Sequence, residues 1–194
     1  MARADGAEDL VWKLKETRPG SAGFLKVEAR SYRMPDGQVA DWDILRGGRT
    51  VAMVAITEDG KVLLVRQFRP GPGRILLELP GGNVGQGEDV ALAAARELLE
   101  ETGYAAGEVR IAGQTWLASY ATHQRYAVIA TGCRPVPAAQ RTAHEDALEF
   151  IEPVLLSMDE FRAHVSGGQL TDTDIAFMCL NQLIQEAGAG PARP

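Results

Sequence analysis

Residues 81–104 read GGNVGQGEDVALAAARELLEETGY, and the rest of the chain is organised around this stretch. It opens with a run of glycines, which permit backbone conformations closed to other residues and let backbone amides approach a phosphate. Glu88 and Asp89 suit the positive end of a helix macrodipole, and Gly103 suits a left-handed C-terminal cap. The stretch therefore predicts a glycine-rich loop that feeds a helix from about Asp89 to Thr102.

Three glutamates lie on one side of that predicted helix. Glu97 and Glu101 are four residues apart and Glu100 is three beyond Glu97, so their carboxylates project from neighbouring turns. Such like charges repel one another unless a cation lies between them. Carboxylate oxygens beside a phosphate-binding loop suit a hard divalent ion, Mg²⁺ first and Mn²⁺ second. The alternative interpretation is a solvated acidic helix face.

The spacing of this stretch resembles the signature of the Nudix hydrolases. Gly82 is followed by five residues and Glu88, and then by seven residues and the run Arg96-Glu97-Leu98-Leu99-Glu100-Glu101-Thr102-Gly103-Tyr104. The match holds at every defined position of the signature. The resemblance implies an α/β/α sandwich with a mixed sheet, a divalent metal on the helix glutamates, and a substrate in which a nucleoside diphosphate is linked to another group.

Carried over by position, the resemblance also implies roles for single residues. The implied metal ligands in this stretch are Gly81, through its carbonyl, Glu97 and Glu101. Glu100 is implied as a ligand or as a support for one. Arg96 orients a glutamate and, with Glu88, resembles the pair that ties the loop to the helix. The amide of Gly82 is expected to lie against the substrate.

A base must come from outside the helix, because glutamates neutralised by a metal are poor acceptors for the proton of an attacking water. In the resembling family it comes from the loop before the last sheet strand, which is the stretch 142–149 here. Glu145 is expected to be this base, since it lies inside the loop. Glu149 begins the strand and is expected to be an additional metal ligand. The alternative is two solvated acids in a polar loop.

Upstream of the glycines the chain resembles one subfamily, the ADP-ribose pyrophosphatases. Residues 24–34 and 39–45 predict a β-hairpin, and the segments Val65–Pro70 and Leu77–Gly82 resemble that subfamily too. In the subfamily such N-terminal strands pack across a two-fold axis, which implies a homodimer. We therefore expect an N-terminal arm and hairpin over 1–47, a Nudix domain over 48–188 and a disordered tail over 189–194.

Alternating apolar residues and turn signals predict the other elements of the sandwich. Sequence positions of the expected strands are 50–57, 61–68, 75–79, 109–118, 125–132 and 148–156. A capping-box pattern at Ser157 predicts a helix to about Val165, and a second helix is expected from Thr173 to Glu186.

Three arginines just before the glycines can clamp phosphates, because a guanidinium fork matches phosphate oxygens. They are Arg66, Arg69 and Arg74. Surface solvation is the alternative for each. Glu78, at the end of a strand that leads to the glycines, either binds substrate or is solvated at the sheet edge.

Four further side chains have two interpretations each. The aromatic rings of Trp42, Phe68 and Tyr120 can stack on a base, although the hydrophobic core is the more common place for such residues. His123 either touches substrate or is solvated in its loop. Cys133 and Cys179 are expected to be reduced thiols in the core.

One departure from the subfamily leaves the substrate open. A Ser-Pro-Gly-like turn is usual after the signature, whereas residues 119–123 read SYATH. Tyr120 is placed like a tyrosine of the diadenosine polyphosphate hydrolases. The main expectation is hydrolysis of ADP-ribose or a related nucleoside diphosphate sugar. The alternatives are a dinucleoside polyphosphate or GDP-mannose hydrolase, and a catalytically silent module that senses a nucleotide sugar.

Composition excludes several classes of partner. The 194 residues carry a formal net charge of −6, which disfavours non-specific binding to nucleic acid. No apolar run approaches the ~20 residues of a membrane span, and the acidic start lacks the apolar core of a signal peptide. We therefore expect a cytoplasmic protein that acts on a small nucleotide.

Overall fold

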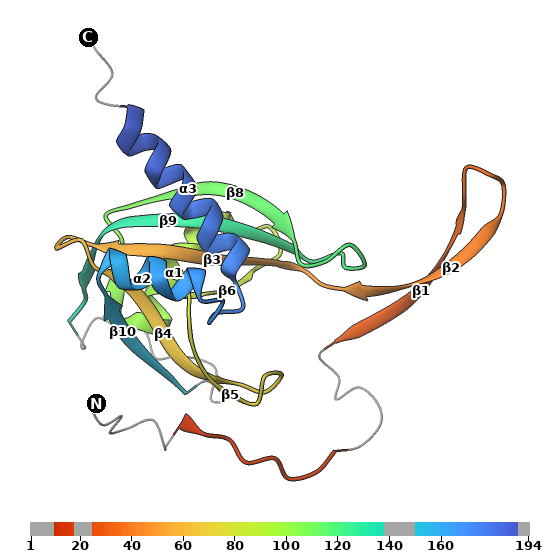
Figure 1. The fold of residues 1–194 in the computed structure, drawn as a ribbon, viewed down its shortest axis with the longest axis horizontal. Coiled ribbons are helices and arrows are strands. Elements are labelled where there is room, and N and C mark those ends of the chain that lie inside the picture. The colour runs from red at the N-terminus through yellow and green to blue at the C-terminus, as the bar shows by residue number, and fades with distance from the viewer. Residues whose placement is uncertain (1–9, 18–24, 138–149, 190–194) are drawn as a thin grey trace.

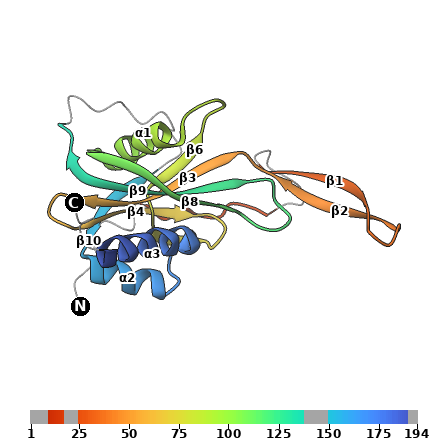
Figure 2. The same cartoon turned by 90° about the horizontal axis from the view of Figure 1, so that it is seen from above.

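The computed structural model describes residues 10–17, 25–137 and 150–189. Two strands near its N-terminus, β1 (Lys26–Arg33) and β2 (Val39–Arg46), pair antiparallel and confirm the predicted hairpin. The turn between them closes with Gly37, whose φ of 86° suits a residue without a side chain. The hairpin projects away from the body of the molecule (Figures 1 and 2). Its Trp42 side chain is 56% exposed, so the expectation of a core tryptophan is wrong.

The remaining strands form one mixed sheet in the order β10-β4-β3-β9-β7, with β5, β6 and β8 paired onto β4, β3 and β9. The strands β3 and β9 are parallel, and the other pairs are antiparallel. Their bounds are β3 Arg49–Thr57, β4 Val62–Arg69, β5 Arg74–Glu78, β6 Gly81–Val84, β7 Tyr104–Ala105, β8 Glu108–Trp116, β9 Gln124–Pro135 and β10 Ile151–Leu156.

Helices cover both faces of the sheet, because its central strands are apolar on both sides. Side chains of β3 alternate: Val51 and Met53 pack in a cluster under α1 (Val90–Thr102), whereas Ala52 and Val54 pack in a second cluster with α2 (Met158–Ser166) and α3 (Thr173–Ala189). Figure 2 shows α1 on one side of the sheet and α2 and α3 on the other. This arrangement confirms the predicted α/β/α sandwich.

Three local expectations are corrected by the structure. Residues Gly81–Val84 were expected to be loop, but they form β6, paired with β3 from Arg49 to Ala52. Asp89, expected as the first residue of the helix, is its N-cap, so the helix begins at Val90 and Glu88 lies before it. The helix α3 continues through Ala189, which was assigned to a disordered tail.

No helix in the described ranges is long and apolar enough to cross a membrane. Cys133 and Cys179 are buried, one in each core cluster, as expected for packing thiols. Burial raises the pKa of both thiols to about 11, because the thiolate loses its hydration.

Candidate active site

The helix α1 is fixed at both ends by the residues that the sequence singled out. The Asp89 carboxylate accepts from the backbone N–H groups of Ala91 and Leu92 at 2.9 and 3.1 Å. At the other end Gly103 adopts a left-handed conformation, with φ 71°, and its N–H donates to the Leu99 carbonyl at 2.9 Å. These caps confirm the predicted helix and hold its glutamates in register.

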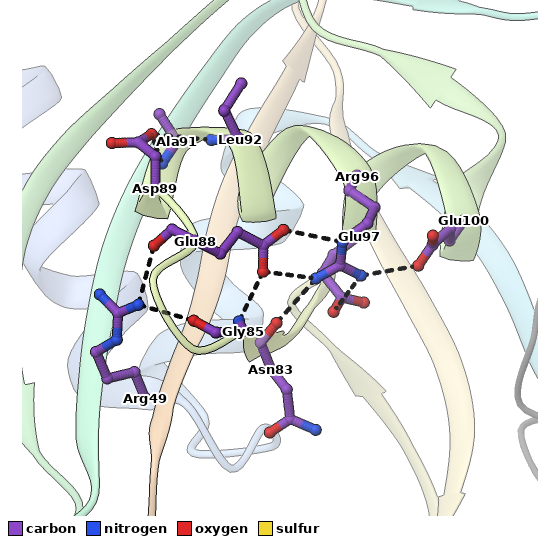
Figure 3. A network of polar contacts seen from close by, with 10 residues as sticks. All are labelled: Arg49, Asn83, Gly85, Glu88, Asp89, Ala91, Leu92, Arg96, Glu97 and Glu100. Carbon is purple, nitrogen blue, oxygen red and sulfur yellow. Dashed lines mark hydrogen bonds and ion pairs between the residues drawn. The ribbon is translucent and has the colours of Figure 1, made fainter.

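Arg96 joins the acidic side chains of this region to one another (Figure 3). Its Nη1 donates to Glu97 at 2.9 Å and to Glu100 at 3.0 Å, and its Nε donates to Glu88 at 3.2 Å. Nη2 donates to the carbonyl of Asn83 at 2.9 Å. The guanidinium therefore orients two helix carboxylates and ties the helix to the end of β6, as the sequence predicted.

The loop between β6 and α1 is held by charge-assisted bonds. The Glu88 carboxylate accepts from the Gly85 N–H at 2.6 Å, and these bonds to Arg96 and Gly85 lower the pKa of Glu88. From β3, Arg49 donates to the carbonyls of both Gly85 and Glu88 at 2.9 Å. Arg49 is a structural residue of the site that the sequence did not single out.

Two glycines let the helix glutamates meet the bare backbone of β6. The Gly81 N–H donates to Glu101 Oε2 at 2.8 Å. A Cβ on Gly82 would lie 2.5 Å from the Glu97 carboxylate, and one on Gly81 would lie 2.1 Å from the carbonyl oxygen of Val51. At Gly81 the obstacle is the backbone of β3, so no side chain fits, whereas a side chain at Gly82 would displace the Glu97 carboxylate from its position against β6.

A pocket of about 400 Å³ lies at this edge of the sheet. It brings Gly81, Gly82 and Glu101 together with groups from β4, the β4–β5 turn, the β8–β9 connection and the start of α3. Its full lining is Thr50, Val51, Ala52, Gln67, Arg69, Pro70, Gly71, Pro72, Leu79, Gly81, Gly82, Glu101, Leu117, His123, Arg125, Thr171, Asp172 and Ile175.

A buried ion-pair cluster forms the wall of the pocket beside α3. Arg125 of β9 is buried, and its guanidinium donates to Asp172 and, at 2.9 Å, to Asp174. Burial raises the pKa of Asp172, against the opposing pull of Arg125. No local sequence pattern marks Arg125, Asp172 and Asp174 as a cluster, because Arg125 lies far from the two aspartates in the chain.

Glu78 is fully buried and therefore is not solvated at the sheet edge. Its carboxylate accepts from the backbone N–H of Thr171 at 2.8 Å and from the Thr171 hydroxyl, and it pairs with Arg69 at 3.3 Å. The carboxylate thus joins the end of β5 to the segment before α3, directly behind the pocket wall.

The three candidate phosphate clamps are separated by the fold. Arg69 lines the pocket. Arg66 pairs with Glu152 of β10 at 3.2 Å, and Arg74 is exposed opposite Arg69 in the β4–β5 register. Neither Arg66 nor Arg74 belongs to the pocket lining.

The aromatic candidates lie outside the pocket, whereas the histidine lines it. Phe68 stacks on Trp12 of the N-terminal arm with ring centroids 5.5 Å apart, and Tyr120 is 58% exposed rather than in the core. His123 lines the pocket, and its Nε2 lies 2.9 Å from the Thr50 hydroxyl oxygen.

Two predicted residues, Glu145 and Glu149, lie outside the described residues, and their roles stay predictions. Within the described ranges no three His, Cys, Asp or Glu side chains gather into a metal cage. The donor chemistry nevertheless suits a hard divalent ion, because Glu97 and Glu101 present only oxygens beside the bare backbone of Gly81 and Gly82. Such an ion needs one or two protein carboxylates when water and phosphate supply the other ligands.

The comparison with protein families decides the membership of the chain. The family model described as NUDIX domain matches residues 47–171. The chain belongs to the Nudix family. Members of this family generally use a divalent metal, in agreement with the donor set around Gly81 and Gly82.

Two relatives of this Nudix chain align along most of its length, and a third aligns along less than half of it. The methanol dehydrogenase activator of Bacillus methanolicus is 29% identical over 173 residues, covering 86% of this chain and 89% of that protein. The ADP-ribose pyrophosphatase of Bacillus subtilis is 28% identical over 172 residues with the same coverage. The ADP-sugar pyrophosphatase of Mus musculus is 37% identical over 97 residues, covering 44% of each chain.

A solved structure supports the fold. The crystal structure of an ADP compounds hydrolase superimposes with a TM-score of 0.73 at 21% identity, covering 90% of this chain and 92% of that one. The aligned region therefore includes most of the residues of this chain that lie outside the matched range 47–171.

Proposed function

We propose that this protein hydrolyses the diphosphate bond of ADP-ribose or a related nucleoside diphosphate sugar to a nucleoside monophosphate and a sugar phosphate. Water adds its oxygen to one phosphorus, the bridging P–O bond breaks, and the water proton passes to a carboxylate. The observation that carries the proposal is that one pocket joins Glu101, Gly81 and Gly82 to Arg69. The similarity to the Bacillus subtilis ADP-ribose pyrophosphatase over 86% of this chain supports this choice of substrate.

Each residue near Gly81 has a proposed task. Glu97, Glu101 and the Gly81 carbonyl would hold Mg²⁺, with Mn²⁺ as a substitute. The ion would neutralise diphosphate charge and activate water. Arg96 keeps the Glu97 and Glu100 carboxylates in place through the bonds at 2.9 and 3.0 Å.

Substrate contacts and the base complete the assignment. Arg69 is the proposed phosphate clamp, since its guanidinium lines the pocket and is 37% exposed. The Gly82 backbone, without a side chain, is proposed to lie along the diphosphate. Glu145 remains the proposed base and Glu149 the proposed additional ligand, both on the family resemblance.

A substrate panel tests the proposal. Purified protein with Mg²⁺ is given ADP-ribose, ADP-glucose, GDP-mannose, diadenosine polyphosphates and NADH, with released phosphomonoesters read by a coupled phosphatase. We expect the highest kcat/KM with ADP-ribose or another nucleoside diphosphate sugar. A preference for diadenosine polyphosphates would replace the substrate but keep the chemistry. Absence of turnover with every compound would reject the enzyme assignment.

A second candidate function follows from the other relative that aligns along most of the chain. The Bacillus methanolicus protein is named as an activator of methanol dehydrogenase, and it is as similar to this chain as the pyrophosphatase is. Activation of a dehydrogenase is therefore testable by adding this protein to a methanol dehydrogenase assay. A rise in dehydrogenase turnover that Glu101→Gln abolishes would connect the two functions, whereas no rise would remove the candidate.

The hairpin is proposed to pair with a second copy of the chain in a cytoplasmic homodimer. Apolar side chains on β1 and β2 are exposed in the single chain, including Val27, Val39 and Trp42. Symmetric pairing would cover them. Sedimentation is expected to give a dimer, and a stable 20.9 kDa monomer at micromolar concentration would remove this idea.

A further inference from the structure

Backbone hydrogen bonds join the base of the hairpin, where β2 leads into β3, to the β8–β9 connection that lines the pocket. The Thr122 N–H donates to the Leu45 carbonyl at 3.0 Å, and the Gln124 N–H donates to the Gly48 carbonyl at 3.0 Å. These bonds flank His123 in the β8–β9 connection. Any displacement of the hairpin base therefore acts on the backbone that carries this histidine.

The side chain of Thr122 adds a second link at the same point. Its hydroxyl accepts from the Gly47 N–H at 3.0 Å and lies 3.2 Å from the Gly47 carbonyl, to which it donates. Gly47 also lies against the histidine, since a Cβ placed there would be 2.4 Å from His123 Cβ and 2.9 Å from Nδ1. The imidazole thus packs directly on a glycine of the hairpin base, where no larger residue fits.

The imidazole faces the pocket as an uncharged group. His123, Thr50 and Arg125 all line the pocket, and Nε2 lies 2.9 Å from the Thr50 hydroxyl oxygen. Burial, followed by the nearby positive charge of Arg125, lowers the pKa of His123. A histidine with a lowered pKa is neutral at pH 7, so its interactions with a ligand are hydrogen bonds rather than ion pairs.

We propose that His123 contacts the substrate through a hydrogen bond of its imidazole, and that Gly47 and Thr122 are positioning residues that hold the ring there. This inference rests on the proposed function, because the ligand is taken to be a nucleoside diphosphate sugar. The hairpin and the pocket are then coupled: a partner that shifts the hairpin base also moves a substrate contact.

Imidazole resonances give the first test. The full chain is studied by NMR in EDTA, so that ADP-ribose binds without turnover. The sequence has three histidines, and His123→Ala identifies the signal of interest. We expect this signal to shift with ADP-ribose, whereas the signal of His164, which donates to the Leu77 carbonyl at 2.7 Å on the α2 side, stays constant. A constant His123 signal while backbone amides of the pocket respond would overturn the contact.

A comparison of two ligands shows which part of the substrate His123 contacts. ADP lacks the terminal sugar of ADP-ribose. A shift with ADP-ribose alone assigns His123 to that sugar, and an equal shift with ADP assigns it to the ADP half of the molecule.

Kinetics on the best substrate of the panel give the second test. Thr122→Val removes the hydroxyl and Thr122→Ser keeps it. His123→Ala and Thr122→Val are expected to raise KM about three- to tenfold, as for loss of one neutral hydrogen bond, with kcat changed less than about twofold. Thr122→Ser should restore KM. The matched control is Thr131→Val on β9, far from the pocket lining.

The outcomes separate this inference from the function that it assumes. Unchanged KM in both His123→Ala and Thr122→Val, with an active parent, overturns the inference and leaves the proposed function intact. An inactive parent with every substrate overturns both. If His123→Ala does not fold by thermal melting, the Thr122→Val and Thr122→Ser pair decides alone.

Discussion

The two faces of the sheet hold their charged groups differently. On the α1 face, the Arg96 side chain is 39% exposed and shares its donors among Glu88, Glu97 and Glu100. On the α3 face, the Arg125 side chain is only 10% exposed and is paired with Asp172 and Asp174. Partly exposed pairs exchange partners at little cost, whereas a buried charge that loses its partner is strongly destabilising. The contrast lies in the arginines, since the carboxylates around Arg96 are 12–26% exposed and those around Arg125 are 22% and 47% exposed.

The largest effect is expected from breaking the buried cluster. Arg125→Leu removes the buried guanidinium that Asp172 and Asp174 share and should lower the free energy of unfolding by about 2 to 3 kcal/mol, below the value for a fully buried pair because both carboxylates are partly exposed. Urea denaturation measures the loss. The matched control is Arg110→Leu, which removes a surface pair to Glu186 and should lower the free energy of unfolding much less. Equal losses in the two variants would contradict the contrast between the faces.

The next effect concerns chemistry on the α1 face. Glu101→Gln keeps an oxygen for the Gly81 N–H but removes the charge proposed to hold the metal. We expect kcat to fall by at least ~10²-fold with little change in the free energy of unfolding. Glu186→Gln, on the exposed end of α3, is the control and should turn over like the parent. Near-normal turnover of Glu101→Gln with added Mg²⁺ would reject the ligand assignment.

A smaller effect is expected in the pH dependence of stability. Bonds from Arg96 and the Gly85 N–H lower the pKa of Glu88 from its ordinary 4.5. A folded-state pKa below the unfolded one contributes stability above pH 4.5, and this contribution is lost as the pH falls through the folded value. Glu88→Gln should therefore be less stable than the parent at pH 7 and equally stable at the acidic end. A difference that does not change with pH would contradict the role of the charge.

The smallest effect is expected in the alkylation rates of the two cysteines. Because one cysteine lies in each core cluster, the two rates report the opening of each face of the sheet separately. Since burial raises both thiol pKa values to about 11, alkylation of native protein by iodoacetamide at pH 8 should be slow for Cys133 and Cys179. Arg125→Leu should speed the reaction of Cys179, in the α3-face cluster, more than that of Cys133, in the α1-face cluster. Mass spectrometry of the labelled peptides gives both rates, and parallel acceleration would mean that the faces open together.

The same contrast explains what the sequence could predict. The groups on the α1 face come from one continuous stretch, in which helix spacing puts Glu97, Glu100 and Arg96 on neighbouring turns. Caps at Asp89 and Gly103 have local signals as well. The helix, its ends and the orienting role of Arg96 were therefore predictable without any tertiary information.

The groups on the α3 face have no such local signal. Arg125 and Asp172 are 47 residues apart, and only the packing of α3 against β9 brings them together. Glu78 and Thr171 are separated by 93 residues. Arg66 was a reasonable phosphate clamp by composition, but the antiparallel register of β10 and β4 sets Glu152 opposite it. Such pairings depend on strand register between distant segments, which one sequence does not reveal.

The glycine segment was misjudged for a related reason. Glycine has a low propensity for strands, so Gly81–Val84 was predicted as loop, yet four register pairs with β3 make it a strand. A ladder of backbone bonds restricts the dihedral angles of Gly81 and Gly82 before any ligand arrives. Their conformational entropy is thus lost during folding rather than on binding, so a ligand that lies along this backbone meets amides and carbonyls already in place. Slow hydrogen exchange at Gly82 and Val84 in the free protein would be the direct sign of this preorganisation.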